Sequence, residues 1–181
     1  RPETILGDTA ICVNPKDKRY SNLVGKNVYV PLINRKIPII SDEYVDMEFG
    51  TGALKITPAH DINDYEIGYR HKLETIDILN NDGTLNEKAK LFVGTDRFKA
   101  RELIVEELKK NNHLVKIENH KNKVGFSERT NSIIEPKLSM QWFLKMDKIS
   151  KPGLDNVING NIKFHPEKFI NTYKHWMSNI K

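Results

Sequence analysis

Five side chains that can bind or polarise a small substrate lie within ten residues of one another. They supply two carboxylates, an ammonium group, a hydroxyl and an imidazole: Lys55, Thr57, His60, Asp61 and Asp64. A glycine turn and a short apolar-rich strand precede them, and a proline bend leads into a helix start, so the set lies at a strand-to-helix corner. Sites often collect at such corners, because a rigid scaffold holds loop side chains that need not pack.

This combination of groups fits a small zwitterionic substrate. One carboxylate would take an α-ammonium group while Lys55 and Thr57 address a carbonyl or a hydroxyl. Catalysis would then come from positioning and from polarising a bound water. The same residues also fit a helix N-terminus, with Asp61 as the N-cap and Asp64 in the first turn. Both interpretations are open at this point.

Other catalytic classes lack their sequence signatures. The chain has no G-x-S-x-G nucleophile elbow and no phosphate-binding glycine loop. Its single cysteine, Cys12, excludes an internal disulfide, and His60 and His71 lie too far apart for a H-x-x-x-H zinc pattern. We therefore predict no metal ion. The formal charge of +5 is compatible with a polyanionic partner without establishing one.

Periodicity and turn residues predict many short strands and few helices. Strands are expected at residues 9–13, in a hairpin over 27–40, and at 43–45, 53–56, 75–79 and 114–118, with a basic hairpin tip at 120–123. Helices are expected at 62–73, at 96–112 and after Pro166, with a break at 151–153. The fold class is mixed α+β, with a small β-barrel core and flanking helices.

Residues 1–128 and 129–181 differ in character, which predicts two parts. The second part carries much aromatic surface, including Trp142 and Phe143, and would need a partner domain. The chain starts with Arg1 and has no signal peptide or apolar run of membrane-spanning length. We expect a soluble, cytoplasmic piece of a longer polypeptide.

Several motifs resemble one known family in order along the chain. Residues 1–4 (RPET) and 6–10 (LGDTA) are similar to the threonine-rich peptide of class I aminoacyl-tRNA synthetase editing domains. The valyl type of this family is similar at residues 42–46, 49–52, 55–61, 63–64, 81–86 and 139–143. The isoleucyl type reads closer to T-A-P-G-H-G-x-D-D at the corner, whereas this chain has I-T-P-A-H-D.

The resemblance implies a hydrolytic editing activity. Such a domain removes threonine mischarged onto tRNA(Val), by water attack on the aminoacyl ester, within an enzyme that ligates valine to tRNA(Val) using ATP. Threonine is nearly isosteric with valine, and a hydrophobic pocket rejects the added hydroxyl by only about 10², a figure that comes from the valyl enzyme itself. A second site must therefore bind the hydroxyl directly.

The resemblance also implies roles for individual residues. Asp64 matches the aspartate that holds the substrate's α-ammonium group, and Lys55, Thr57 and Asp61 match polar groups of the pocket. Asp61 is our first choice for the group that binds the threonine hydroxyl, with Asp64 sharing the task.

Three further residues complete the predicted pocket. Arg1 and Phe49 match substrate-binding positions, with Phe49 as a wall for the side chain. His60 is a candidate general base or, equally well, a histidine that fixes the loop.

The implied partners are the threonylated acceptor end of tRNA(Val) and the catalytic core of the same chain. Threonyl-adenylate is an alternative substrate. The editing domain needs no cofactor, since ATP and Mg²⁺ belong to the catalytic core, and we expect a monomer without a membrane. Some relatives have a Cys-x-x-Cys zinc site near residues 127–134, but this chain has Thr130 and Ile133 there.

Two other function classes remain as alternatives. A non-catalytic RNA-binding barrel would use the basic residues 121–123 and the final helix, although no aromatic pair interleaves them as a stacking platform requires. A structural connector would explain residues 130–181 better than residues 1–128.

Overall fold

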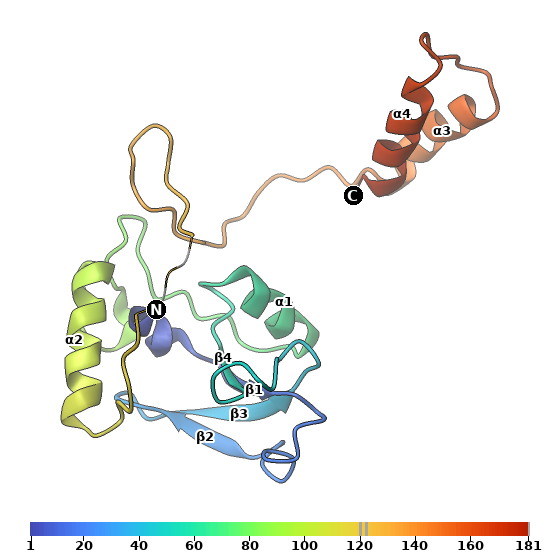
Figure 1. Ribbon diagram of the computed structural model, residues 1–181. Helices are drawn as coiled ribbons and strands as arrows, with labels where there is room; N and C mark the ends of the chain where they lie inside the picture. Colours follow the sequence, from blue (N-terminus) through green and yellow to red (C-terminus); the bar gives the residue numbers. More distant parts are fainter. Residues whose placement is uncertain (120, 122, 181) are drawn as a thin grey trace. The chain divides into compact units, whose positions relative to one another are not determined.

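The computed structural model describes residues 1–119, 121 and 123–180. Its chain forms two compact units, residues 1–138 and a smaller unit that starts at Ser139. The two units are described separately below (Figure 1). The division into an editing domain at residues 1–128 and a connecting segment at residues 129–181, which leads back to a catalytic core, stays a prediction.

The first unit is built on one mixed four-stranded sheet. Its strands are β1 (Ala10–Val13), β2 (Asn27–Val30), β3 (Arg35–Ser41) and β4 (Ala53–Ile56), in the order β2-β3-β1-β4. β1 runs parallel to β3 and antiparallel to β4, while β2 and β3 form the predicted antiparallel hairpin. The pairing of Ala10 with Ile56 fixes the register between β1 and β4, and this register positions the site.

The mixed α+β class is confirmed, but the barrel is not. Among the described residues the four named strands form an open sheet with β2 and β4 at its edges. The strands expected at 43–45, 75–79 and 114–118 are wrong, because these segments are turns or irregular chain apart from a single β-bridge between Leu79 and Leu85. Side chains take the N–H groups that a neighbouring strand would otherwise bind, as Tyr44 N donates to Asp42 and Ile78 N donates to His60. Val115 stands free in solvent.

α1 (Ile62–Arg70) packs on the sheet and α2 (Arg97–Lys110) packs on the 3-10 turn η1 (Pro2–Gly7), which gives two apolar clusters. α1 and α2 confirm the two helices expected here, and a second 3-10 turn spans Glu87–Ala89 (η2). Ile67 of α1 packs with Cys12, Ile56 and other residues of β1 and β4. On the other side of the unit, Leu6 of η1 joins the buried face of α2. The expected hairpin tip at 120–123 lies partly outside the described residues.

The second unit is a pair of packed helices, α3 (Asp147–Ile158) and α4 (Phe169–Asn179). The break expected at residues 151–153 is wrong, because Pro152 lies inside α3. At the next position, Gly153 allows a close approach between the helices. A Cβ atom there would lie 3.2 Å from the Tyr173 hydroxyl of α4. Helix packing thus outweighs the local cost of proline.

Candidate functional site

Asp64 lies at the centre of the predicted corner. It is in the first turn of α1 and only 3% exposed. Its Oδ2 atom accepts hydrogen bonds from Lys55 Nζ at 2.5 Å and from the backbone N of Thr57 at 2.9 Å. Since Lys55 lies on β4 and Thr57 directly follows it, the end of the strand holds the carboxylate in place. Half of the Lys55 side chain remains accessible to solvent.

Thr57 connects Asp64 to a second buried carboxyl group. Thr57 is 0% exposed, and its Oγ1 donates to Asp8 Oδ1 at 2.5 Å. Burial raises the pKa of Asp8 to about 7, although the Thr57 hydrogen bond and the Lys55 charge oppose this rise. Sequence reasoning did not single out Asp8 as a site residue. A lone acidic residue within the otherwise uncharged run Leu6–Ala10 was the available signal.

Asp8 opens onto a cavity of about 330 Å³, which we call the Asp8 cavity. Its polar lining comes from Arg1, Thr4, Asp8 and Lys55. The remaining lining is apolar or aromatic: Pro2, Ile5, Ile11, Val28, Tyr29, Val30, Pro31 and Ile37. The cavity thus combines charged groups with a largely apolar remainder, and most of its lining comes from η1 and from the strands of the sheet.

Three predicted site residues line other hollows, namely Asp61, Phe49 and His60, of which His60 is described below. Asp61 caps α1, with its Oδ1 accepting from Asn63 N at 2.8 Å and Asp64 N at 3.0 Å, and it lines a separate hollow beside Tyr65. Phe49 is 75% exposed and lines a third hollow formed by residues 44–54. The structure therefore brings Arg1 and Lys55 together at the Asp8 cavity, with Thr57 and Asp64 behind them.

Acidic residues fix the guanidinium group of Arg1 on several sides. It donates to Glu3 and to the carbonyl of His60, both at 3.1 Å, and forms an ion pair with Glu135. Glu3 is fully buried and also binds Arg101 through two hydrogen bonds. Burial alone would raise the pKa of Glu3, but Arg101 and Arg1 lower it to about 2. Glu3 therefore stays ionised.

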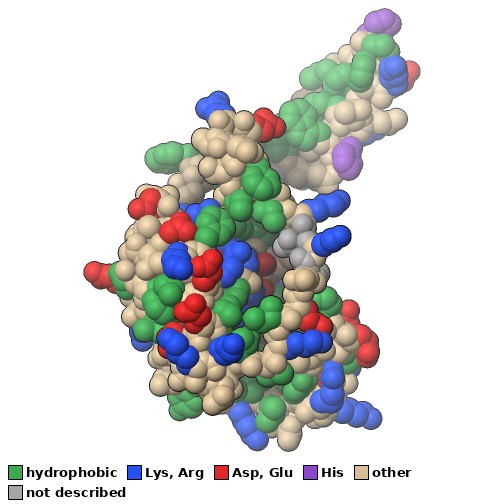
Figure 2. All heavy atoms as spheres, turned by 60° about the vertical axis from the view of Figure 1, so that its left-hand side comes forward, with side chains coloured by type: hydrophobic (Ala, Val, Ile, Leu, Met, Phe, Trp, Pro, Cys, Tyr) green, Lys and Arg blue, Asp and Glu red, His purple; other side chains and the backbone are tan. Residues whose placement is uncertain are grey.

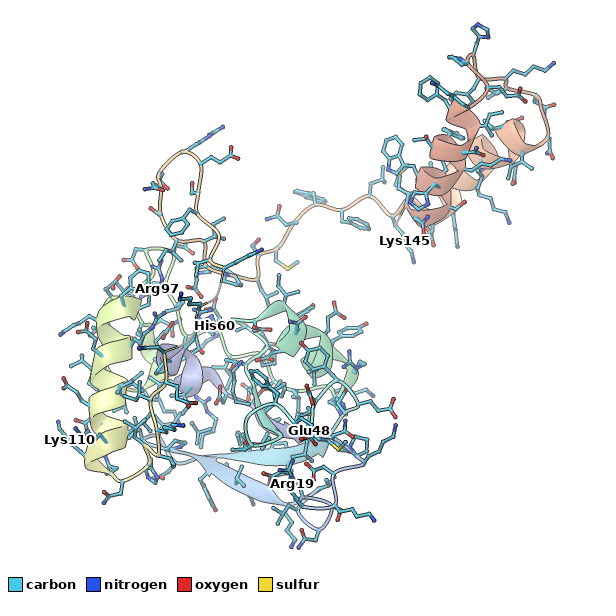
Figure 3. All side chains as sticks on the ribbon, in the orientation of Figure 1. Arg19, Glu48, His60, Arg97, Lys110 and Lys145 are labelled. Atoms are coloured by element: carbon cyan, nitrogen blue, oxygen red, sulfur yellow. The ribbon has the colours of Figure 1, made fainter. Side chains whose placement is uncertain are left out.

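His60 faces away from Asp8 and lines a second, larger cavity. Its buried ring accepts a hydrogen bond from Ile78 N at Nε2, 3.2 Å away, and burial lowers its pKa. Within the part of the chain that the structure describes, its buried Nδ1 has no hydrogen-bond partner. Both His60 and Arg97 of α2 line this cavity (Figure 3).

The second cavity, called the His60 cavity, has a volume of about 560 Å³. It is lined by His60, Asp77, Leu79, Asn80, Asn81, Asp82, Gly83, Arg97, Phe98, Ser132, Ile133, Glu135, Pro136 and Lys137.

Across residues 1–119, 121 and 123–180, no group of three or more histidine, cysteine or acidic residues could hold a metal ion. Within those same ranges, no helix is long and apolar enough to cross a membrane.

Comparison with known proteins identifies the family. The family model described as "Leucyl-tRNA synthetase, editing domain" matches residues 12–124, more than half of the chain. A solved structure described as "The crystal structure of GlLeuRS-CP1" superposes with a TM-score of 0.52, covering 68% of this chain and 82% of that one. At 16% identity it supports the fold alone.

Similarity to curated proteins extends over the whole chain. It is 59% identical to the valine–tRNA ligases of Parabacteroides distasonis and Porphyromonas gingivalis, and 56% identical to that of Clostridium tetani. Each match covers 100% of this chain and 21% of the relative, so the chain spans about a fifth of their length. The chain therefore belongs to the aminoacyl-tRNA synthetase editing-domain family represented by the leucyl-tRNA synthetase editing domain.

Proposed function

We propose that this chain is the editing domain of a valine–tRNA ligase and hydrolyses the ester that links threonine to tRNA(Val). Whole-chain identity of 59% to valine–tRNA ligases supports the valyl assignment. The observation that carries the site is Asp64, a nearly buried carboxylate joined to the half-exposed Lys55 at the edge of the Asp8 cavity. Such a carboxylate suits an α-ammonium group.

The proposed reaction uses positioning more than covalent catalysis. The α-ammonium group of the substrate replaces Lys55 Nζ at Asp64 Oδ2, and Lys55 is then free to bind the ester carbonyl. A water attacks that carbonyl, the ester C–O bond breaks, and threonine and a free ribose hydroxyl are released. A neighbouring ribose hydroxyl helps to place the water. Arg1, held by Glu3 and Glu135, offers its remaining guanidinium N–H donors to the acceptor end.

The activity of the complete protein belongs to the same proposal. Because the chain spans about a fifth of its curated relatives, valine ligation, ATP and Mg²⁺ would belong to a catalytic core outside residues 1–181. The threonylated acceptor end of tRNA(Val) would move from that core to the Asp8 cavity. Threonyl-adenylate is a second candidate substrate at the same site.

A deacylation assay on the full-length ligase tests the proposal. Asp64→Ala should lower the hydrolysis of Thr-tRNA(Val) at least about 100-fold, because the α-ammonium group loses its charged partner. Thr-tRNA(Val) should then accumulate while Val-tRNA(Val) still forms. The matched control is Glu66→Ala, which removes an exposed acidic residue of the same helix and should leave hydrolysis unchanged. Normal hydrolysis by Asp64→Ala would contradict the site.

The charges on the molecular surface give less support to the RNA-binding alternative. The face that carries α2 mixes basic and acidic side chains (Figure 2), and two basic residues there pair with acidic neighbours, Lys99 with Glu102 and Lys110 with Glu107. If binding were the whole function, wild-type protein would bind tRNA with a steep salt dependence and would not deacylate Thr-tRNA(Val).

A further inference from the structure

Thr57 cannot itself contact a ligand in the Asp8 cavity. It is 0% exposed, and both of its polar donors are already used, the backbone N by Asp64 and the hydroxyl by Asp8. Asp8, at 4% exposed, is among the residues that line the cavity. The polar role predicted for Thr57 therefore passes to the carboxyl group that Thr57 holds.

The two oxygens of Asp8 differ in their surroundings. Oδ1 accepts the Thr57 hydroxyl at 2.5 Å. Within the described residues, Oδ2 receives no hydrogen bond, yet it is not among the polar atoms sealed from solvent without a partner. This oxygen thus keeps an open hydrogen-bonding position at the cavity. A buried carboxyl group with an unused position favours a ligand that can fill it.

The apolar part of the cavity lining defines the other half of the ligand. Ile11 of β1, Val28 of β2 and Ile37 of β3 contribute apolar side chains to the lining. Such a wall suits a methyl group, and the Asp8 carboxyl suits a hydroxyl. A side chain that branches at its β-carbon into one methyl and one hydroxyl matches both surfaces.

We propose that Asp8 is a specificity-determining residue that hydrogen-bonds the side-chain hydroxyl of the bound threonyl group, with Thr57 as the residue that positions it. This proposal rests on the proposed function. Valine would place a methyl group against Oδ2 and leave it without a partner, which disfavours binding. A carboxyl group that accepts or donates can pair with a hydroxyl in either protonation state.

The experiment measures binding to the full-length ligase of two non-hydrolysable amide analogues, threonyl- and 2-aminobutyryl-3′-aminoadenosine. The second lacks only the side-chain hydroxyl. Wild type should bind the threonyl analogue at least about tenfold more tightly, which is the usual cost of leaving one buried polar group without its hydrogen-bond partner. Asp8→Ala should bring this ratio close to one, because threonyl affinity falls while 2-aminobutyryl affinity stays the same or rises.

Two further variants protect the test against a folding defect. Asp8→Asn keeps the shape and an acceptor for Thr57, so it should retain most of the threonyl preference. Thr57→Val removes the hydroxyl that orients Asp8 at nearly constant volume, so its ratio should fall between those of wild type and Asp8→Ala. Glu66→Ala is the control, and its ratio should match that of wild type.

The outcomes separate this proposal from the proposed function. If Asp8→Ala weakens both analogues equally, or slows hydrolysis with an unchanged affinity ratio, Asp8 has a structural or proton-transfer role and the hydroxyl assignment is overturned. Hydrolysis of Thr-tRNA(Val) by wild type would still support editing in that case. If wild type binds neither analogue and does not hydrolyse the ester, both proposals fail.

Discussion

The Asp8 cavity and the His60 cavity of the first unit differ in the partners of their charged groups. In the larger His60 cavity, Arg97 pairs with Glu135 at 3.3 Å, and Lys137 binds Asn81 at 2.9 Å. In the smaller Asp8 cavity, the carboxyl group of Asp8 takes a neutral hydroxyl in place of a cation. Volume alone would favour the His60 cavity over the Asp8 cavity. Unused bonding capacity does not separate the two, because the buried Nδ1 of His60 also lacks a partner among the described residues. The Asp8 cavity is favoured because Lys55, the partner of the nearly buried Asp64, lines it.

The cavities are nevertheless joined by one ion pair. Arg1 lines the Asp8 cavity, Glu135 lines the His60 cavity, and their side chains pair directly. Glu135 also pairs with Arg97. Variants that break this shared pair would disturb both cavities, so the comparison is best tested with residues that line only one of them.

The largest effect is expected from Lys55, which lines only the Asp8 cavity of the two. In the full-length ligase, Lys55→Met should lower kcat/KM for Thr-tRNA(Val) hydrolysis about ten- to a hundredfold, because the ester carbonyl loses the ammonium group that binds it in the proposed reaction. The free energy of unfolding should change by less than about 1 kcal/mol, since the lysine is half exposed. A lost or broadened unfolding transition would show instead that the pair is mainly structural.

An intermediate effect concerns the pH dependence of stability. The folded state keeps the proton of Asp8 up to a pKa of about 7, while the unfolded chain releases it near 3.8. The contribution of Asp8 to the wild-type free energy of unfolding should therefore be largest below pH 4 and should be lost as the pH rises from 4 to 7. The Asp8→Asn variant has no carboxyl group to ionise at this position, so its unfolding free energy should not show this fall. The unfolding free energy of the variant minus that of wild type should therefore be about 1–3 kcal/mol larger at pH 8 than at pH 4.

Urea titrations of both proteins at the two pH values measure this difference. Glu3 does not confuse the result, because its pKa is lowered to about 2 and it is present in both proteins. A gap that stays constant with pH would mean that Asp8 is ionised in the folded state across this range. Asp8 would then be charged in the folded protein, as Glu3 is, and the two carboxyl groups would not differ in their protonation.

The smallest effect is expected in the His60 cavity. Asn81→Ala removes the amide oxygen that accepts from Lys137 in that cavity. Hydrolysis of Thr-tRNA(Val) should remain within about twofold of wild type, because a surface polar contact contributes little and Asn81 is remote from the Asp8 lining. A loss comparable with that of Lys55→Met would place the His60 cavity on the substrate path.

Local sequence signals predicted the elements whose ends have their own caps. Asp61 and Asp96 cap α1 and α2, and both helices follow apolar spacing. The strand predicted at residues 75–79 was wrong, because Ile78 N binds a histidine far away in sequence. The break predicted at Pro152 was wrong for a similar reason, since α3 packs against α4 and continues through the proline. Tertiary partners decide such segments, and local patterns do not contain them.

Local sequence signals also predicted only part of the site. Lys55, Thr57 and Asp64 lie within one strand-to-helix corner, so their spacing alone brought them together. Asp8 lies 49 residues before Thr57. Only the pairing of Ala10 with Ile56 places Asp8 beside Thr57, and a single sequence does not reveal strand register.

The two attachments of Thr57 limit how this pocket can be altered. One residue supports two carboxyl groups, its backbone supporting Asp64 and its hydroxyl supporting Asp8. Backbone support survives most substitutions, whereas hydroxyl support does not. A redesign for another amino acid can therefore exchange position 57 to release Asp8 alone, and recognition of the side chain becomes separable from recognition of the amino group.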